Sequence, residues 1–269
     1  MVCKSNGQSA WERDVIEDYQ FNLDRYINHR QDFFPRGEFL EHMNRDSVNA
    51  LIDTLKIFAM ERVADDVENL KLSAFFELGF LYFLLDEGDS TIAMMGRAMK
   101  LVGKDRSPWE YAMINALAAE ACKRKGYHKL SNDYNAEILS IPAYVADTFH
   151  RASTLAFMAE NYYSLLEYDK SMECCRESFN LFTATGNYAN ASYQLVIMSR
   201  LSKAIYNDTS FLEYLHMANE MASRSGDSAR IANNLVNTGM GYLSIGEYAR
   251  GLVFLLKGWN YDRKVFPYR

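Results

Sequence analysis

The sequence contains few of the residues on which several protein classes depend. Its 269 residues include only 4 prolines and 14 glycines. Both residues are frequent in disordered chains and in the turns of all-β domains, so their scarcity argues against these two classes. The longest apolar run, residues 78–85, is interrupted by Gly79. It falls far short of the ~18 residues that a membrane-spanning helix needs.

Cysteine is equally scarce, with only Cys3, Cys122, Cys174 and Cys175 in the chain. Adjacent residues on a helix project about 100° apart, so Cys174 and Cys175 are poorly placed to bridge each other. No cysteine or histidine pair has the spacing of a zinc site, and the N-terminal residues lack the apolar segment of a secretory signal. We therefore predict reduced thiols in a cytoplasmic protein with no metal and no cofactor.

Catalytic motifs and a basic excess are also missing. The net charge is −6, which argues against binding DNA or RNA through bulk electrostatics. No phosphate-cradling glycine loop is present, and the five histidines stand apart without a nucleophile motif around them. The sequence therefore predicts a protein that is not an enzyme.

What the chain does contain is a repeat of forty residues. Its last copy, residues 235–262, reads as two short helices with a turn at Gly246, and it resembles a tetratricopeptide (TPR) unit. Small residues recur in register at Gly79, Ala119, Ala159, Ser199 and Gly239. In four of these five copies, the residue four positions earlier is bulky and apolar.

A second set of positions repeats with the same period in the second helix of each unit. These positions are Ala98, Ile138, Ser178, Ala218 and Gly258, and all of them except Ile138 hold a small residue. Small residues at fixed positions let two helices approach closely, so we predict an all-α fold. It is a TPR-like right-handed α-solenoid of about five helical hairpins over residues 69–269. Residues 11–68 have a helical pattern that does not match the repeat, and we predict a separate N-terminal helical bundle there.

A stack of such hairpins presents its first helices on a concave face, which suits an extended peptide. Side-chain amides can pair with a peptide backbone, and Arg or Lys can pair with a carboxylate. An ordinary solvated face with no ligand is the alternative. The peptide-binding candidates at the inward positions are Lys123, Tyr163, Tyr193, Arg200, Lys203, Asn233, Asn237 and Met240.

Two segments resemble repeats of the Rap proteins of peptide quorum sensing, within the wider RRNPP group. They are AENYYSLLEYDKSMECCRESFNLF and NLVNTGMGYLSIGEYARGLVFLLKGWNYD, the second with Asn237 two residues before Gly239. The resemblance implies that the repeats bind a short peptide and that the N-terminal helices engage a response regulator or a transcription regulator. The chain departs from the family in having about five repeats, where the family usually has more.

We therefore expect a non-enzymatic, peptide-responsive regulator, with no nucleic-acid or membrane partner. A generic TPR scaffold in a larger assembly and a response-regulator phosphatase are the alternatives. Some Rap proteins use a glutamine for dephosphorylation, but no motif around Gln20 or Gln31 transfers that role. The last helix keeps apolar residues where a solenoid end should be polar. Either a second copy covers this end, as a homodimer, or further repeats have been lost.

The register of the repeat can be tested at Ala159, which it places where two helices touch. Replacing Ala159 with Leu should overpack that contact and lower the free energy of unfolding by about 1–3 kcal/mol. Thermal unfolding measures the effect, and a melting temperature equal to that of the wild type would contradict the register.

Overall fold

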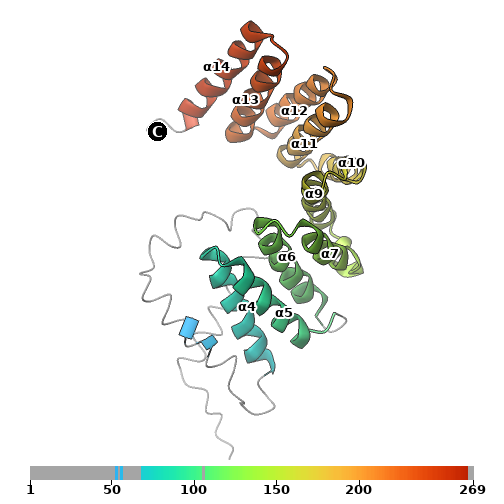
Figure 1. Ribbon diagram of the computed structural model, residues 1–269, viewed down its shortest axis with the longest axis vertical. Coiled ribbons are helices and arrows are strands. Elements are labelled where there is room, and N and C mark those ends of the chain that lie inside the picture. Colours follow the sequence, from blue (N-terminus) through green and yellow to red (C-terminus); the bar gives the residue numbers. More distant parts are fainter. Residues whose placement is uncertain (1–51, 54, 57–67, 105–106, 266–269) are drawn as a thin grey trace, which may run out of the picture. The chain divides into compact units, whose positions relative to one another are not determined.

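The computed structural model describes residues 52–53, 55–56, 68–104 and 107–265. These residues form helices joined by short turns, with no strand in the described ranges, so the all-α prediction is confirmed (Figure 1). None of the described helices has the length and apolar character that crossing a membrane requires. The N-terminal helical segment predicted for residues 11–68 lies outside the described residues except at 52–53, 55–56 and 68.

The chain divides into two compact units, residues 1–125 and 126–269. In the first unit, α4 (Glu68–Leu84) and α5 (Gly88–Leu101) form a hairpin, and α5 also packs on α6 (Pro108–Arg124). The predicted turn at residues 86–89 joins α4 to α5, so the first hairpin is confirmed.

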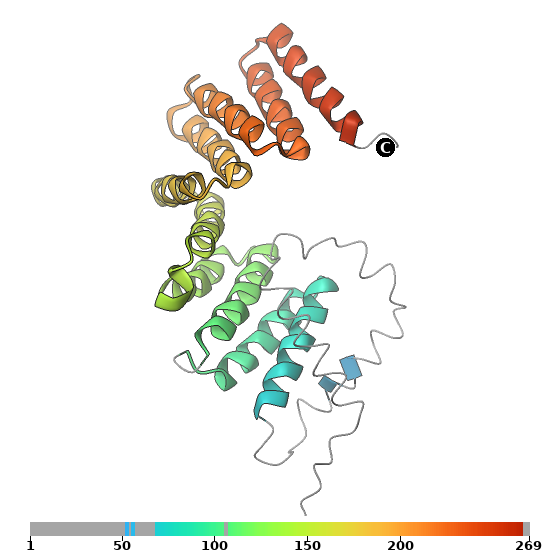
Figure 2. The ribbon, with the colours of Figure 1, turned by 180° about the vertical axis from the view of Figure 1, so that it is seen from behind.

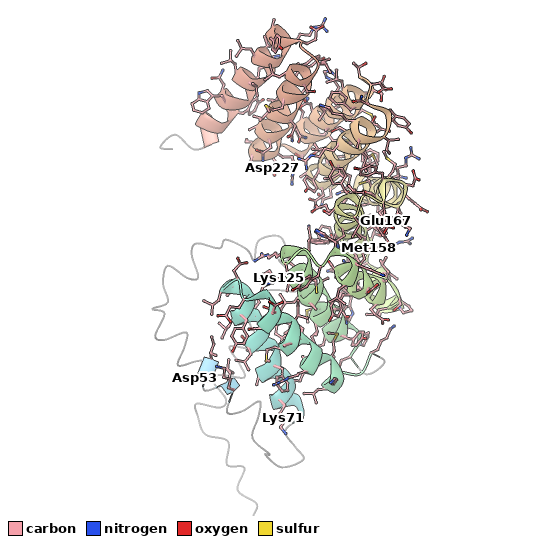
Figure 3. All side chains as sticks on the ribbon, in the orientation of Figure 1. Asp53, Lys71, Lys125, Met158, Glu167 and Asp227 are labelled. Carbon is pink, nitrogen blue, oxygen red and sulfur yellow. The ribbon has the colours of Figure 1, made fainter. Side chains whose placement is uncertain are left out.

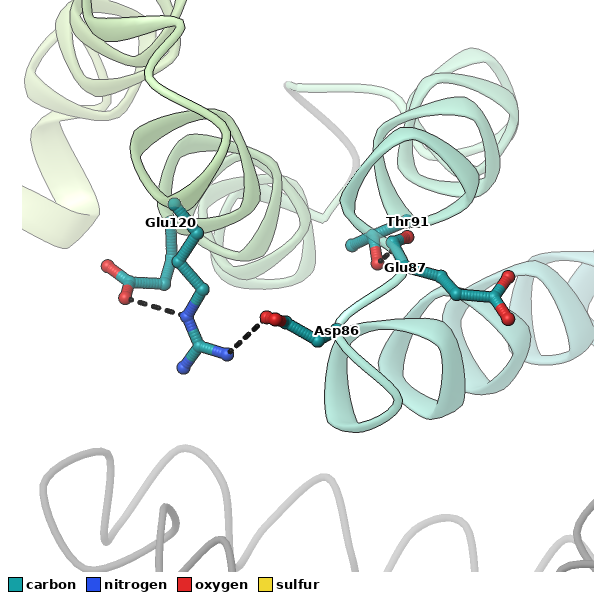
Figure 4. Close-up of polar contacts among 5 residues, drawn as sticks. Asp86, Glu87, Thr91 and Glu120 are labelled. Carbon is teal, nitrogen blue, oxygen red and sulfur yellow. Dashed lines mark hydrogen bonds and ion pairs between the residues drawn. The ribbon is translucent and has the colours of Figure 1, made fainter.

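Charged residues at the end of α6 hold it against the α4–α5 turn (Figure 4). Arg124 lies 3.4 Å from Glu120 and 3.9 Å from Asp86, and its guanidinium is 3.9 Å from the centre of the Phe83 ring. These ion pairs are partly exposed, so each contributes only about 0–1 kcal/mol. Their main effect is to orient the end of α6.

The second unit contains three well-formed hairpins (Figures 1 and 2). The first helix of each hairpin packs on its second helix, and α10 and α12 also pack on the first helix of the next hairpin. The hairpins are α9 (Thr148–Ser164) with α10 (Tyr168–Ala184), α11 (Tyr188–Tyr206) with α12 (Phe211–Ser225), and α13 (Ser228–Ser244) with α14 (Tyr248–Val265).

Two shorter helices precede these hairpins: α7 (His128–Leu139) and α8 (Pro142–Val145). The sequence predicts that the third repeat starts at Tyr144, but Tyr144 belongs to the single turn of α8 and α9 starts at Thr148. Pro142 causes this difference because its fixed φ angle suits the first turn of a new helix.

Side-chain caps set where the first helices begin. Asp147, Asn187 and Asp227 precede α9, α11 and α13, and each side-chain oxygen accepts a hydrogen bond from the backbone N–H three residues on, at 2.9 to 3.2 Å. Figure 3 shows Asp227 at the start of α13. The preceding helices end at Ala184 and Ser225, and Gly186 and Gly226 follow them with φ of +73° and +69°.

The small residues of the repeat are buried in all five copies, and so are the five matching positions of the second helices. Hydrogen bonds across the α9–α10 hairpin confirm that its helices lie close together. The Ser171 hydroxyl donates to the Ala159 carbonyl at 2.7 Å, and the Ser178 hydroxyl donates to the Ala152 carbonyl at 2.8 Å.

In the last hairpin, backbone atoms of the two helices lie close together. A Cβ atom added to Gly239 would lie 2.9 Å from the Gly251 carbonyl oxygen and 2.8 Å from Leu255 Cγ. One added to Gly258 would lie 3.0 Å from the Ala232 carbonyl oxygen. Backbone atoms cannot move aside as a flexible side chain does, so glycine is required at these positions.

Two glycine substitutions should therefore have opposite effects on stability. Gly239→Ala should destabilise the protein by about 1–3 kcal/mol because its methyl group overlaps α14. Gly96→Ala is the matched control within α5, where an added Cβ meets no atom within 4 Å. It should stabilise by about 0.5–1 kcal/mol because alanine restricts the unfolded chain. Chemical denaturation of both variants measures the difference, and equal effects would contradict the close approach of α13 and α14.

Candidate peptide-binding surface

The first helices α9, α11 and α13 are neighbours in the second unit. α11 contacts α9 on one side and α13 on the other, and second helices cover two further sides of it. Seven of the eight predicted site residues lie on these three helices. They are Tyr163 on α9, Tyr193, Arg200 and Lys203 on α11, and Asn233, Asn237 and Met240 on α13.

Helix α13 has distinct inner and outer rows. On the inner row, the Asn234 amide donates to the Ala218 carbonyl at 3.0 Å, and Thr238 accepts from the Asn219 amide at 2.7 Å. The outer row is the predicted set Asn233, Asn237 and Met240, in which Met240 is 58% exposed. The spacing of four and then three residues keeps these side chains on one face, as predicted.

Tyr193 is the centre of a polar group that spans the three helices. Its half-buried hydroxyl is hydrogen-bonded to the Glu160 carboxylate of α9, and the Arg230 guanidinium of α13 lies 5.2 Å from its ring centre. Burial, and then the charge of Glu160, raise the pKa of Tyr193, while Arg200 and Arg230 act in the opposite direction. Side chains from three helices, α9, α11 and α13, therefore meet around Tyr193.

Arg230 is a residue that the sequence prediction missed. It lies in the first turn of α13, before the positions counted as inward-facing in the repeat. A signal was present, because Arg230 is three residues before Asn233 and seven before Asn237, which places it on the same helix face. The cap at Asp227, which accepts from the Arg230 backbone N–H at 2.9 Å, fixes this first turn.

Other predicted residues contact their own hairpin. The Lys203 ammonium lies 5.0 Å from the ring centre of Phe211, at the start of α12. The Tyr163 ring lies 5.9 Å from that of Tyr168, at the start of α10. Arg200, by contrast, interacts electrostatically with Tyr193. Arg200 and Lys203 both lie on α11, three positions apart, and stay peptide-binding candidates.

Lys123 belongs to a different unit from the other candidates. It is half-buried on α6 in the first unit, whereas the rest belong to the second.

An apolar hollow borders the outer row of α13. It has a volume of about 470 Å³ and lies between α13 and α14. Asn233 is the only polar side chain among its lining residues, which are Ala232, Asn233, Val236, Leu255, Leu256, Gly258 and Trp259. The arrangement suits an apolar side chain next to a backbone amide that pairs with Asn233.

The described residues offer no activated nucleophile or metal site. No group of His, Cys, Asp and Glu in the described ranges could hold a metal ion. Burial raises the pKa of Cys122 to about 12 and that of Cys174 to about 11, so both thiols stay protonated at neutral pH.

Comparison with known proteins gives the fold. No protein-family model matches the sequence, and no curated protein is similar to it. Solved structures do match, among them BtubC from P. vanneervenii, with a TM-score of 0.63 and 13% identity over 83% of this chain and 91% of that one. The apo form of RapI matches with a TM-score of 0.60 and 14% identity over 92% of this chain and 98% of that one.

A Rap protein complexed with Competence and Sporulation Factor matches with a TM-score of 0.58 and 14% identity. The match covers 94% of this chain and 66% of that one. The predicted resemblance to Rap-type TPR proteins is thus confirmed at the level of the fold.

Proposed function

We propose that this protein is a non-enzymatic regulator that binds an extended peptide or protein segment on the surface formed by α9, α11 and α13. The observation that carries the proposal is the polar group around Tyr193, which joins Glu160, Arg200 and Arg230 from three helices. Beside it, Asn233 and Asn237 project from the outer row of α13. A ligand that crosses the three helices would contact all of these side chains.

The chemistry of the surface favours a ligand with a carboxylate. Arg200, Lys203 and Arg230 are cationic, whereas the Glu160 carboxylate already accepts a hydrogen bond from Tyr193. A guanidinium can pair with a carboxylate through two parallel hydrogen bonds. The amides of Asn233 and Asn237 can each donate to and accept from a peptide backbone. An acidic residue or a free C-terminus would therefore lie near Arg200 and Arg230.

One structural relative supports a peptide rather than another ligand. A Rap protein of similar fold has been solved in complex with Competence and Sporulation Factor. By analogy, we propose a role in peptide quorum sensing, in the cytoplasm, with residues 69–269 as the repeat domain.

The proposed partners follow the same analogy. The N-terminal segment, residues 11–68, would engage a response regulator or a transcription regulator, and the chain would form a homodimer through its C-terminal end. A generic TPR scaffold and a response-regulator phosphatase remain the alternative functions.

The proposal is tested by selecting a binder from an array of short peptides and titrating it calorimetrically into variants. Arg200→Ala and Asn237→Ala should each weaken binding about ten-fold or more, because a hydrogen bond to a charged group contributes about 1.5–3 kcal/mol. Helix content by circular dichroism should not change, since Arg200 is exposed and Asn237 lies on the outer row.

Matched controls are available on α10. Arg176→Ala and Asn180→Ala remove the same side chains from exposed positions of a second helix, and they should bind as the wild type does. Unchanged affinity in Arg200→Ala and Asn237→Ala, with the fold intact, would contradict the proposed surface. Failure of any peptide to bind would favour the scaffold function.

A further inference from the structure

The interface between α12 and α13 defines how one hairpin holds the next. The His216 ring is hydrogen-bonded to the Tyr242 hydroxyl at 2.9 Å, and the Asn219 amide donates to Thr238 at 2.7 Å. Leu212 and Leu215 lie against Gly241, where an added Cβ would be 3.3 Å and 2.7 Å from their methyl groups. Phe211 also lies against Gly241, and the row that α12 directs to α13 beyond it includes Leu212, Leu215, His216 and Asn219.

The same positions in α14 are all apolar. Forty residues further on, they are Leu252, Leu255, Leu256 and Trp259. Leu252 is 56% exposed, Leu256 54% and Trp259 59%. Helix α14 packs mainly on α13 and lies at the end of the second unit (Figures 1 and 2). It therefore presents a helix-binding row with large apolar side chains to solvent.

The preceding hairpin confirms that this row is used for packing. The equivalent positions of α10 are Met172, Cys175, Arg176 and Phe179, of which Arg176 is exposed. The other three belong to, or pack against, a buried cluster that also contains Leu195 of α11. Two second helices of this chain therefore hold a helix at these positions, and α14 continues the register of their interfaces.

Two charged residues near the exposed row, Arg250 and Lys257, lie over aromatic rings. Arg250 lies 6.0 Å from the Tyr242 ring centre, and the Lys257 ammonium lies 5.5 Å from the Phe254 ring centre. Over the part of α14 whose side chains are described, helical spacing places no charged residue between Leu252, Leu256 and Trp259. Apposing two such rows would bring no like charges together there.

We infer that this row is the contact face of a homodimer, in which α14 of one copy packs antiparallel on α14 of a second copy. A two-fold axis near Leu256 places the large Trp259 of one copy beside the smaller Leu252 of the other, so the face is self-complementary. Symmetric contacts of this kind are the commonest in soluble homo-oligomers. Large apolar side chains exposed together on one helix face are also typical of a protein interface.

This inference deepens the homodimer included in the proposed function by naming its contact face, and it does not depend on peptide binding.

Sedimentation velocity of the 269-residue chain, from low to high micromolar concentration, should show a species of twice the 31.0 kDa chain mass. Leu252→Glu and Leu256→Glu should each weaken dimerisation by about ten-fold or more, because each buries a charge at the centre of an apolar interface. Both residues are exposed in the single chain, so helix content should be retained.

Leu130→Glu is the matched control, since Leu130 is 40% exposed on α7 and lies outside the row. It should dimerise as the wild type does. Leu256→Cys places a thiol near the proposed axis, and mild oxidation should link two copies, whereas Leu130→Cys should not link them.

A wild-type chain that stays monomeric at every concentration would overturn the inference. So would a dimer that is insensitive to both Glu substitutions, or a dimer in which Leu256→Cys does not cross-link. The peptide titration is a separate measurement, so either proposal can fail alone.

Discussion

The close approach of two helices within each hairpin is the constraint from which the rest of the second unit follows. At Gly239 and Gly258, backbone atoms of the facing helix occupy the space that a Cβ would need. In the α9–α10 hairpin, the helices are close enough for the Ser171 and Ser178 hydroxyls to donate hydrogen bonds to backbone carbonyls of α9. With large residues at these positions the two helices would separate, and the rows that face neighbouring hairpins would lose their register.

This register decides which side chains remain for function. Once α13 packs on α12 through Asn234, Thr238 and Gly241, the neighbouring row of Asn233 and Asn237 lies beside that interface and not within it. The amides of Asn233 and Asn237 are placed on that row by the packing itself. No strained or catalytic geometry is needed to produce a binding surface of this kind.

The forty-residue period made the hairpins and the buried small residues predictable, because each depends on contacts between residues near in sequence. Other features depend on distances between helices, which a sequence pattern does not encode. Arg230 reaches Tyr193 only because α13 lies beside α11. The Lys203 ammonium lies 5.0 Å from the ring centre of Phe211 because the loop before α12 brings that ring within reach. The hollow between α13 and α14 likewise arises from the packing of the two helices and not from a motif.

The two proposed surfaces meet at α13, and their shared residues define how they could influence each other. Asn233 belongs to the outer row of α13 and also lines the hollow, whose other wall includes Leu256 and Trp259 of the exposed row. Arg200, Asn237 and Leu252 do not line it. A ligand confined to Arg200 and Asn237 would therefore leave the α14 face untouched, and dimerisation would leave its affinity unchanged. A ligand that extends past Asn233 into the hollow would contact Leu256 and Trp259 directly. In that case dimerisation and ligand binding would alter each other's free energy by the same amount, because coupling between two binding equilibria is reciprocal.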